Sequence, residues 1–235
     1  MSLAEAREVM FMTSWEQWSE RMADILPELG AETLETLYMV GMSTFFSLLL
    51  GLALAILMIF SGPHGLRPRP RLYGILDVIV NLGRSFPFII LLIAILPFTR
   101  FVVGTTIGST AAIVPLTLAA APFVARIVEA NFLEVDGGVI EAARSFGASD
   151  SQIVFQVLFP EALPSIVLNV AVVAITLLGY SAMAGTVGGG GLGDLAIKYG
   201  YNRFQVDVMV YSVVVLVLIV QLIQSIGNFT YKKLR

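Results

Sequence analysis

Long apolar runs dominate the pattern of the chain. Five of them carry no or very few charged residues: 36–66, 72–99, 101–125, 162–193 and 208–231. Each is long enough to cross a bilayer core as a helix, which takes about 20 apolar residues. The apolar positions are continuous rather than alternating, which disfavours membrane strands. The pattern predicts an all-α, polytopic membrane domain over residues 36–231 with five transmembrane helices. A soluble helical bundle with a very apolar core is the alternative.

The distribution of charge agrees with a membrane protein. Only 13% of the residues are charged, against about 25% in an average globular chain. Eight of the seventeen acidic residues fall within residues 1–35. We therefore expect residues 1–35 to form an acidic segment outside the membrane. Within it, residues 14–29 fit an amphipathic helix at the outer surface, with Trp15 and Trp18 as interfacial anchors; a mobile extension is the alternative.

The basic residues predict the orientation of the domain, because Lys and Arg collect in cytoplasmic loops. With the C-terminus in the cytoplasm, eight basic residues lie inside and five outside. The inside set is Arg67, Arg69, Arg71, Arg126, Arg144, Lys232, Lys233 and Arg235, and the outside set is Arg7, Arg21, Arg100, Lys198 and Arg203. An odd number of spans then places the N-terminus outside.

Two charges lie within the second apolar run. Asp77 and Arg84 are seven residues apart and share one helix face, so they either pair with each other or extend towards the interface. A charge inside a span usually faces protein or water, which gives this pair a structural role or a role in a transport pathway. Four prolines, Pro87, Pro97, Pro115 and Pro122, lie in or beside the spans and are expected to kink them.

The segment 131–160 between the third and fourth spans is long for a connection. Its sequence predicts two short helices. Gly147 can end the first helix in the left-handed conformation. Ser149 and Gln152 form a capping box for the second, and Pro160 and Pro164 precede the fourth span. The segment is either a solvated connector or a lever on which a partner docks.

A resemblance favours the lever. The stretch EAARSFGASDSQIVFQVLFP, residues 141–160, resembles the EAA signature of ABC importer permeases: Glu-Ala-Ala, a glycine after three further residues, and an I-x-L-P ending. Val and Phe replace the Ile and Leu of that ending. Residues 84–126 and 159–193 are similar to the permease subunit of the methionine importer. The resemblance implies that ATPase coupling depends on Glu141, Ala142, Ala143, Arg144, Gly147 and Pro160.

The same resemblance implies a set of partners. The chain would form a translocation pathway as a homodimer in the bacterial inner membrane, with lipid around it, and would import methionine as its D and L isomers. Two separate ATPase subunits would bind ATP and Mg²⁺, and an external substrate-binding lipoprotein would deliver the substrate. We expect no cofactor, metal site, catalytic residue or nucleic-acid partner for the chain itself.

The glycine-rich stretch 185–194 contains the spacing G-x-G-x-x-G at Gly188, Gly190 and Gly193. A dinucleotide-binding loop needs a strand before it, but here a long apolar span precedes the glycines, so we exclude nucleotide binding. The stretch is either an ordinary outer turn or a loop that folds back and shapes the mouth of the pathway. On the second interpretation Tyr180, Met183, Gly188 and Gly191 form the pathway or its gate, although Met183 also suits simple packing.

Other function classes fit less well. Ser181 follows Gly179 and Tyr180 in a span and superficially suits a nucleophile, but the only histidine, His64, is expected at the opposite membrane face. An ion-driven carrier should place charges near the midplane, and only Asp77 and Arg84 approach it. A membrane scaffold would leave the EAA-like segment without a role. A permease for another amino acid or small polar solute remains the main alternative.

Overall fold

A computed structural model describes residues 15–63 and 65–234, and these residues form helices and no strand. Four unbroken stretches are long and apolar enough to cross a membrane, and a bent pair, α3 (Pro70–Ser85) and α4 (Phe88–Ala94), makes a fifth if counted as one span. The all-α membrane class is therefore confirmed. The unbroken stretches lie in α2 (Trp15–Ser61), α6 (Ser109–Leu133), Asp150–Gly185 and α11 (Val206–Leu234).

The second predicted span is not straight. The chain turns by 102° between α3 and α4. Phe86 has an extended backbone, with φ −77° and ψ 127°, as expected for a residue that precedes a proline. Pro87 has no N–H to continue the helix. The rest of the run 72–99 enters a separate helix, α5 (Leu96–Val103), which has Pro97 in its first turn.

The bounds predicted for the third span are also wrong. Phe101 belongs to α5, and α6 begins only at Ser109. Between them lies a turn in which Gly104 and Gly108 have φ of 85° and 98°, a region that favours glycine. At its other end α6 continues to Leu133. Arg126, which we expected in a cytoplasmic loop, therefore lies inside this helix.

The helix α2 is longer than the first predicted span. α2 has 47 residues, which corresponds to about 70 Å and exceeds a bilayer core of about 30 Å. Its N-terminal part includes most of the segment expected as a separate surface helix, so residues 15–29 continue directly into the span. Residues 1–14 and the side chains of Trp15 and Trp18 lie outside the described residues.

The fourth span is the end of a longer helical stretch. α8 (Asp150–Gln152), the π-helical turn η1 (Ile153–Leu158) and α9 (Phe159–Gly185) follow one another without a break. Pro160 and Pro164 therefore lie within the helix rather than ahead of it. After α9 the chain folds back through α10 (Gly191–Leu195) and the π-helical turn η2 (Ala196–Tyr201).

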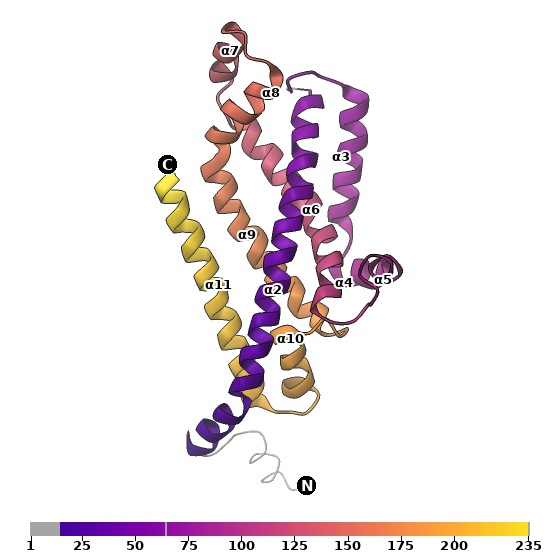
Figure 1. The fold of residues 1–235 in the computed structure, drawn as a ribbon, viewed down its shortest axis with the longest axis vertical. Helices are drawn as coiled ribbons and strands as arrows, with labels where there is room; N and C mark the ends of the chain where they lie inside the picture. Colours follow the sequence, from indigo (N-terminus) through magenta and orange to yellow (C-terminus); the bar gives the residue numbers. More distant parts are fainter. Residues whose placement is uncertain (1–14, 64, 235) are drawn as a thin grey trace.

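The helices form an elongated bundle (Figure 1). α6 packs along α2 and α9, α3 packs on α6, and α11 packs on α9. The core includes Leu116, Phe132 and Leu177, whose side chains are almost fully buried. α7 (Gly137–Ser145) and α8 lie at one end, beside the turn between α2 and α3, and the C-terminus points towards this end (Figure 1). α10 and the N-terminal end of α2 lie at the opposite end (Figure 1).

Candidate functional site: a capped helix at one end and a glycine turn at the other

α7 is a short helix with defined caps at both ends. Asp136 accepts a hydrogen bond from the backbone N–H of Gly138 at 2.8 Å. At the C-terminal end Gly147 has φ 82°. The N–H of Ala148 donates to the carbonyl of Ala143 at 3.1 Å, and that of Gly147 to the carbonyl of Arg144 at 2.9 Å. These two bonds form a Schellman motif, so the predicted left-handed end at Gly147 is confirmed.

The second predicted cap is confirmed as well. The backbone N–H of Gln152 donates to the Ser149 hydroxyl at 3.4 Å, and the N–H of Ser149 donates to the Gln152 side chain at 2.8 Å. This reciprocal capping box fixes the point at which the long helical stretch towards α9 begins. The two caps together define the short linker between α7 and that stretch.

α7 has an inner face and an outer face. Ile140 and Ala143, three residues apart, are partly buried and pack against the core. The outer face carries Val139, Ala142 and Phe146, and the ring of Phe146 is 91% exposed. Glu141 is also exposed. An apolar strip with a small residue at its centre allows another helix or groove to approach closely.

α7 is fastened to two parts of the bundle. It packs on η1, which leads directly into α9. The guanidinium of Arg144 at the end of α7 donates to the carbonyl of Leu66 at 3.1 Å. Next to it, Arg67 forms an ion pair with Asp150, the first residue of α8. Neither contact was predictable from the sequence, because no local pattern brings residues 66 and 67 to residues 144 and 150. α7 and the segment that follows it therefore contact both the turn that leads into α9 and the turn between α2 and α3.

The end of the EAA-like stretch forms the start of α9. Leu158 is buried, and the ring of Phe159 lies 6.3 Å from that of Phe132 on α6. Pro160 is exposed in the first turn of α9. It cannot donate to the carbonyl of Gln156, which lies in the π-helical turn just before it. Residues 157–160 thus join the π-helical turn η1, on which α7 packs, to the start of α9.

The glycine-rich stretch forms a tight turn that packs against α2 and α9 at the opposite end. Gly188, Gly190 and Gly191 all have φ between 77° and 86°, which favours glycine. A Cβ atom on Gly193 would lie 2.4 Å from the Cα of Ala182. The N–H of Leu192 donates to the buried Thr36 hydroxyl at 2.8 Å. The fold-back is confirmed, and the preceding element is a helix rather than the strand of a dinucleotide site.

The four residues assigned to the pathway or gate have different surroundings. The ring of Tyr180 stacks on Phe88 at 4.6 Å. Met183 is 48% exposed, and the carbonyl of Gly188 accepts from the N–H of Gly108 at 2.8 Å. Gly191 is buried, with no room for a Cβ beside Thr36 and Met39, so its position has a packing explanation. The gate role of these residues stays a prediction.

Asp77 pairs with Arg126 and not with Arg84. The guanidinium of Arg126 lies 2.5 Å from the Asp77 carboxylate and 2.8 Å from that of Glu129. Glu129 is buried, and Asn81 bonds to both Asp77 and Arg126. This cluster joins α3 to α6. It pairs the charges of Asp77, Arg126 and Glu129 with one another, and Arg84 is not part of it.

The geometry at Ser181 does not support the hydrolase alternative. Ser181 is buried, and its hydroxyl donates to the carbonyl of Leu178 at 2.8 Å within its own helix. His64 lies outside the described residues. No other histidine occurs in the sequence that could act as a base for Ser181.

Comparisons with known proteins agree with this arrangement. Residues 47–234 match the family of binding-protein-dependent transport system inner membrane components. The chain is 50% identical over 212 residues to a probable D-methionine transport system permease protein of Vibrio cholerae, covering 90% of this chain and 93% of the relative. It is 43% identical over 203 residues to the methionine import system permease protein of Bacillus subtilis, covering 86% and 91%.

Among solved structures, a chain of the MetNI methionine ABC transporter in an inward-facing conformation is 46% identical and has a TM-score of 0.89, covering 90% of this chain and 98% of that one. The match includes the capped helix α7 and the glycine turn within a single family region. The chain therefore belongs to the family of binding-protein-dependent transport system inner membrane components, as a multi-pass ABC transporter permease and not an enzyme.

Proposed function

We propose that this chain is the transmembrane permease subunit of an ATP-driven importer of methionine. The observation that carries the transport mechanism is α7: a capped helix with an exposed apolar strip, fastened to the start of a transmembrane helix. The choice of methionine rests on relatives whose names include methionine and which this chain matches over almost their whole length.

In this proposal two copies of the chain surround the pathway, and each rests on one ATPase subunit that binds ATP and Mg²⁺. α7 and the C-terminus face the cytoplasm, while α10 and the N-terminus face outwards, where a substrate-binding lipoprotein delivers methionine. The arrangement of the ends in Figure 1 supports this orientation, because the basic turn 65–71 lies at the same end as α7.

The coupling step follows from the attachment of α7. ATP binding closes the ATPase pair, and this closure displaces α7. Glu141, Ala142 and Ala143 lie in the part of α7 that docks on the ATPase, and Arg144 and Gly147 lie at its C-terminal end. Packed helices move as rigid bodies. α9 has 27 residues, about 40 Å of helix, so it carries the displacement from Pro160 to Tyr180, Met183 and the glycine turn, which we assign to the gate.

The test is uptake of labelled L- and D-methionine into proteoliposomes that contain this chain, its ATPase subunit and its binding protein. We expect uptake that requires ATP on the side of the membrane where the ATPase lies and that excess unlabelled methionine abolishes. Uptake driven by an ion gradient without ATP would instead favour a carrier. Competition by another amino acid but not by methionine would show that the substrate assignment is wrong.

A further inference from the structure

A cavity of about 200 Å³ lies where the α3–α4 bend meets the middle of α6 and α9. This volume is more than ten times the roughly 10–15 Å³ that a cavity needs on the same measure to hold one water, so the cavity has room for a small solute. The residues around it come from three separate stretches of the chain, the α3–α4 bend, α6 and α9: Gly83, Arg84, Phe86, Phe88, Ala119, Ala120, Phe123, Val173, Thr176 and Tyr180.

Arg84 is the only charged side chain that lines this cavity. Within residues 15–63 and 65–234, the structure gives its guanidinium no hydrogen bond or ion pair. Asp77, the acidic residue on its own helix face, is held by Arg126. A guanidinium carries five donors and remains charged at any physiological pH, so Arg84 presents an unused anion-binding group to the cavity.

The position of Arg84 along the span makes this lack of a partner informative. Thirteen residues of helix separate Arg84 from Arg71, about 20 Å at 1.5 Å per residue. If Arg71 lies near the membrane surface, Arg84 lies deep within a hydrocarbon core of about 30 Å. Charged residues at such depth face water or a ligand rather than lipid. In secondary transporters, broken transmembrane helices near the midplane are a recurring location for substrate sites.

The other groups around the cavity suit the remainder of an amino acid. The carbonyl of Gly83 has no helical donor four residues on, because residue 87 is proline, so it can accept from an ammonium group. The hydroxyl of Tyr180 also has no hydrogen-bond partner within the described part of the chain. Phe88 and Tyr180 stack, with their planes 2° apart, and Phe86 and Phe123 add aromatic surface. Aromatic rings make favourable contacts with a thioether.

We propose that this cavity binds the transported solute, an α-amino acid with an unbranched apolar side chain, whose carboxylate is held by the guanidinium of Arg84. Tyr180 contributes a hydroxyl, and the phenylalanine rings contact the side chain. Thr176 lines the cavity, but its hydroxyl donates to the carbonyl of Val172 within its own helix at 2.9 Å. The proposal rests on the proposed transport function and adds a substrate site within the membrane domain. It also explains why the chain keeps an unpaired cation at a break in a span.

The absence of cysteine from the sequence allows a test that detects even weak binding. The variant Thr176→Cys places one thiol on the cavity, and its labelling by a water-soluble maleimide is measured on this chain by mass spectrometry in the complete permease–ATPase complex in lipid nanodiscs. Methionine is added at increasing concentration, and methioninamide, which lacks the carboxylate, is the matched ligand. Thr105→Cys, on an exposed loop away from the cavity, is the labelling control.

We expect methionine to slow labelling of the Thr176→Cys variant at least about tenfold, with no effect on labelling of the Thr105→Cys variant. Adding Arg84→Gln should raise the half-protecting concentration of methionine about tenfold or more, as expected for loss of a hydrogen bond between charged groups. The same change should barely affect protection by methioninamide.

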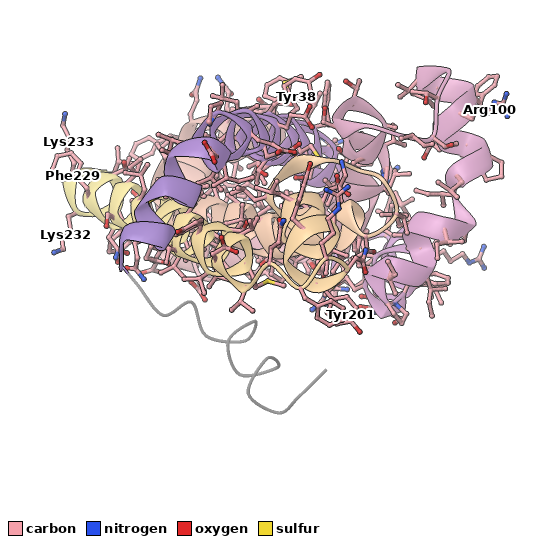
Figure 2. The ribbon with its side chains drawn as sticks, turned by 90° about the horizontal axis from the view of Figure 1, so that it is seen from below. Tyr38, Arg100, Tyr201, Phe229, Lys232 and Lys233 are labelled. Atoms are coloured by element: carbon pink, nitrogen blue, oxygen red, sulfur yellow. The ribbon has the colours of Figure 1, made fainter. Side chains whose placement is uncertain are left out.

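Two further variants complete the test. Arg100→Gln, which removes an exposed arginine at the edge of the bundle (Figure 2), should leave protection unchanged. Tyr180→Phe should weaken protection and keep the ring stack.

Three results would overturn the proposal. A thiol at position 176 that the reagent never reaches would show that the cavity is not open to water. Protection that is equal in the Arg84→Gln variant, or equal for methionine and methioninamide, would remove the carboxylate contact. Normal ATP-driven methionine uptake without protection would reject the site while leaving the transport function intact. Arg84-dependent protection by a different amino acid would correct the substrate and keep the site.

Discussion

At the scale of single residues, the close approach of neighbouring helices explains why glycine occupies several positions in this chain. Gly193 faces the backbone of Ala182, and Gly191 faces Thr36 and Met39. The glycine spacing was visible in the sequence, but this reason for it was not, because the partners lie in other helices. The argument against a nucleotide loop depends only on the span that precedes the glycines, and the structure shows that this span is the helix α9.

Replacing Gly193 with alanine should destabilise the fold-back. The new Cβ would lie 2.4 Å from the Cα of Ala182, and backbone cannot move aside as a flexible side chain can. We expect a loss of about 1–3 kcal/mol, seen as a lower thermal midpoint of the detergent-solubilised complex. Gly179→Ala is the matched control, because nothing lies within 4 Å of a Cβ at that helical position. Equal midpoints for both variants would contradict this packing.

The ion cluster of α3 and α6 gives a second prediction at this scale. Arg126→Gln removes the only cation shown near Asp77 and the buried Glu129 within the described residues. Leaving the buried Glu129 carboxylate uncompensated should cost about 3–5 kcal/mol, and the half-buried Asp77 adds less, so we expect poor expression and a strongly lowered midpoint. Asp77→Asn keeps the Arg126–Glu129 pair and should cost much less. A midpoint for Arg126→Gln as high as that for Arg100→Gln would show that the cluster contributes little.

At the scale of elements, features that depend on neighbouring residues could be predicted from the sequence, whereas features that depend on contacts between distant segments could not. The end of α7 at Gly147 and the capping box at Ser149 and Gln152 were predictable, since each depends on four to six consecutive residues. The break at Pro87 was visible only as a proline, because hydropathy measures apolar content and not the direction of the chain. The Arg67–Asp150 pair and the cavity depend on contacts between distant elements and left no local signal.

The C-terminal cap of α7 should be required for coupling. Gly147 has φ 82°, and no atom lies within 4 Å of a Cβ there, so the effect of Gly147→Ala is conformational. A left-handed alanine costs about 1–2 kcal/mol, which should fray the end of α7. We expect weaker binding of the ATPase subunit and slower ATP-driven uptake. Gly137→Ala, at the start of the same helix and equally free of contacts, should change neither; a loss as large as that of Gly147→Ala would mean that the cap is not the cause.

At the scale of the whole molecule, the bundle connects two ends with different structures. One end presents α7 with its exposed apolar strip, and the other holds the glycine turn against α2 and α9 (Figure 1). α9 runs between them, beside the cavity at the α3–α4 bend. The central claim is that a separate ATPase moves α7 and that this movement reaches the opposite end through α9.

The most direct test of this claim is a crosslink at α7 during transport. The variant Ala142→Cys, with its thiol in the middle of the exposed strip, is combined with a cysteine on the groove of the ATPase subunit, and uptake of labelled methionine is followed before and after oxidation. We predict that the thiol at position 142 forms the crosslink, that oxidation stops ATP-driven uptake and that reduction restores it, while Thr105→Cys forms none. Sustained uptake with no crosslink from any exposed position of α7 to the ATPase would contradict the account.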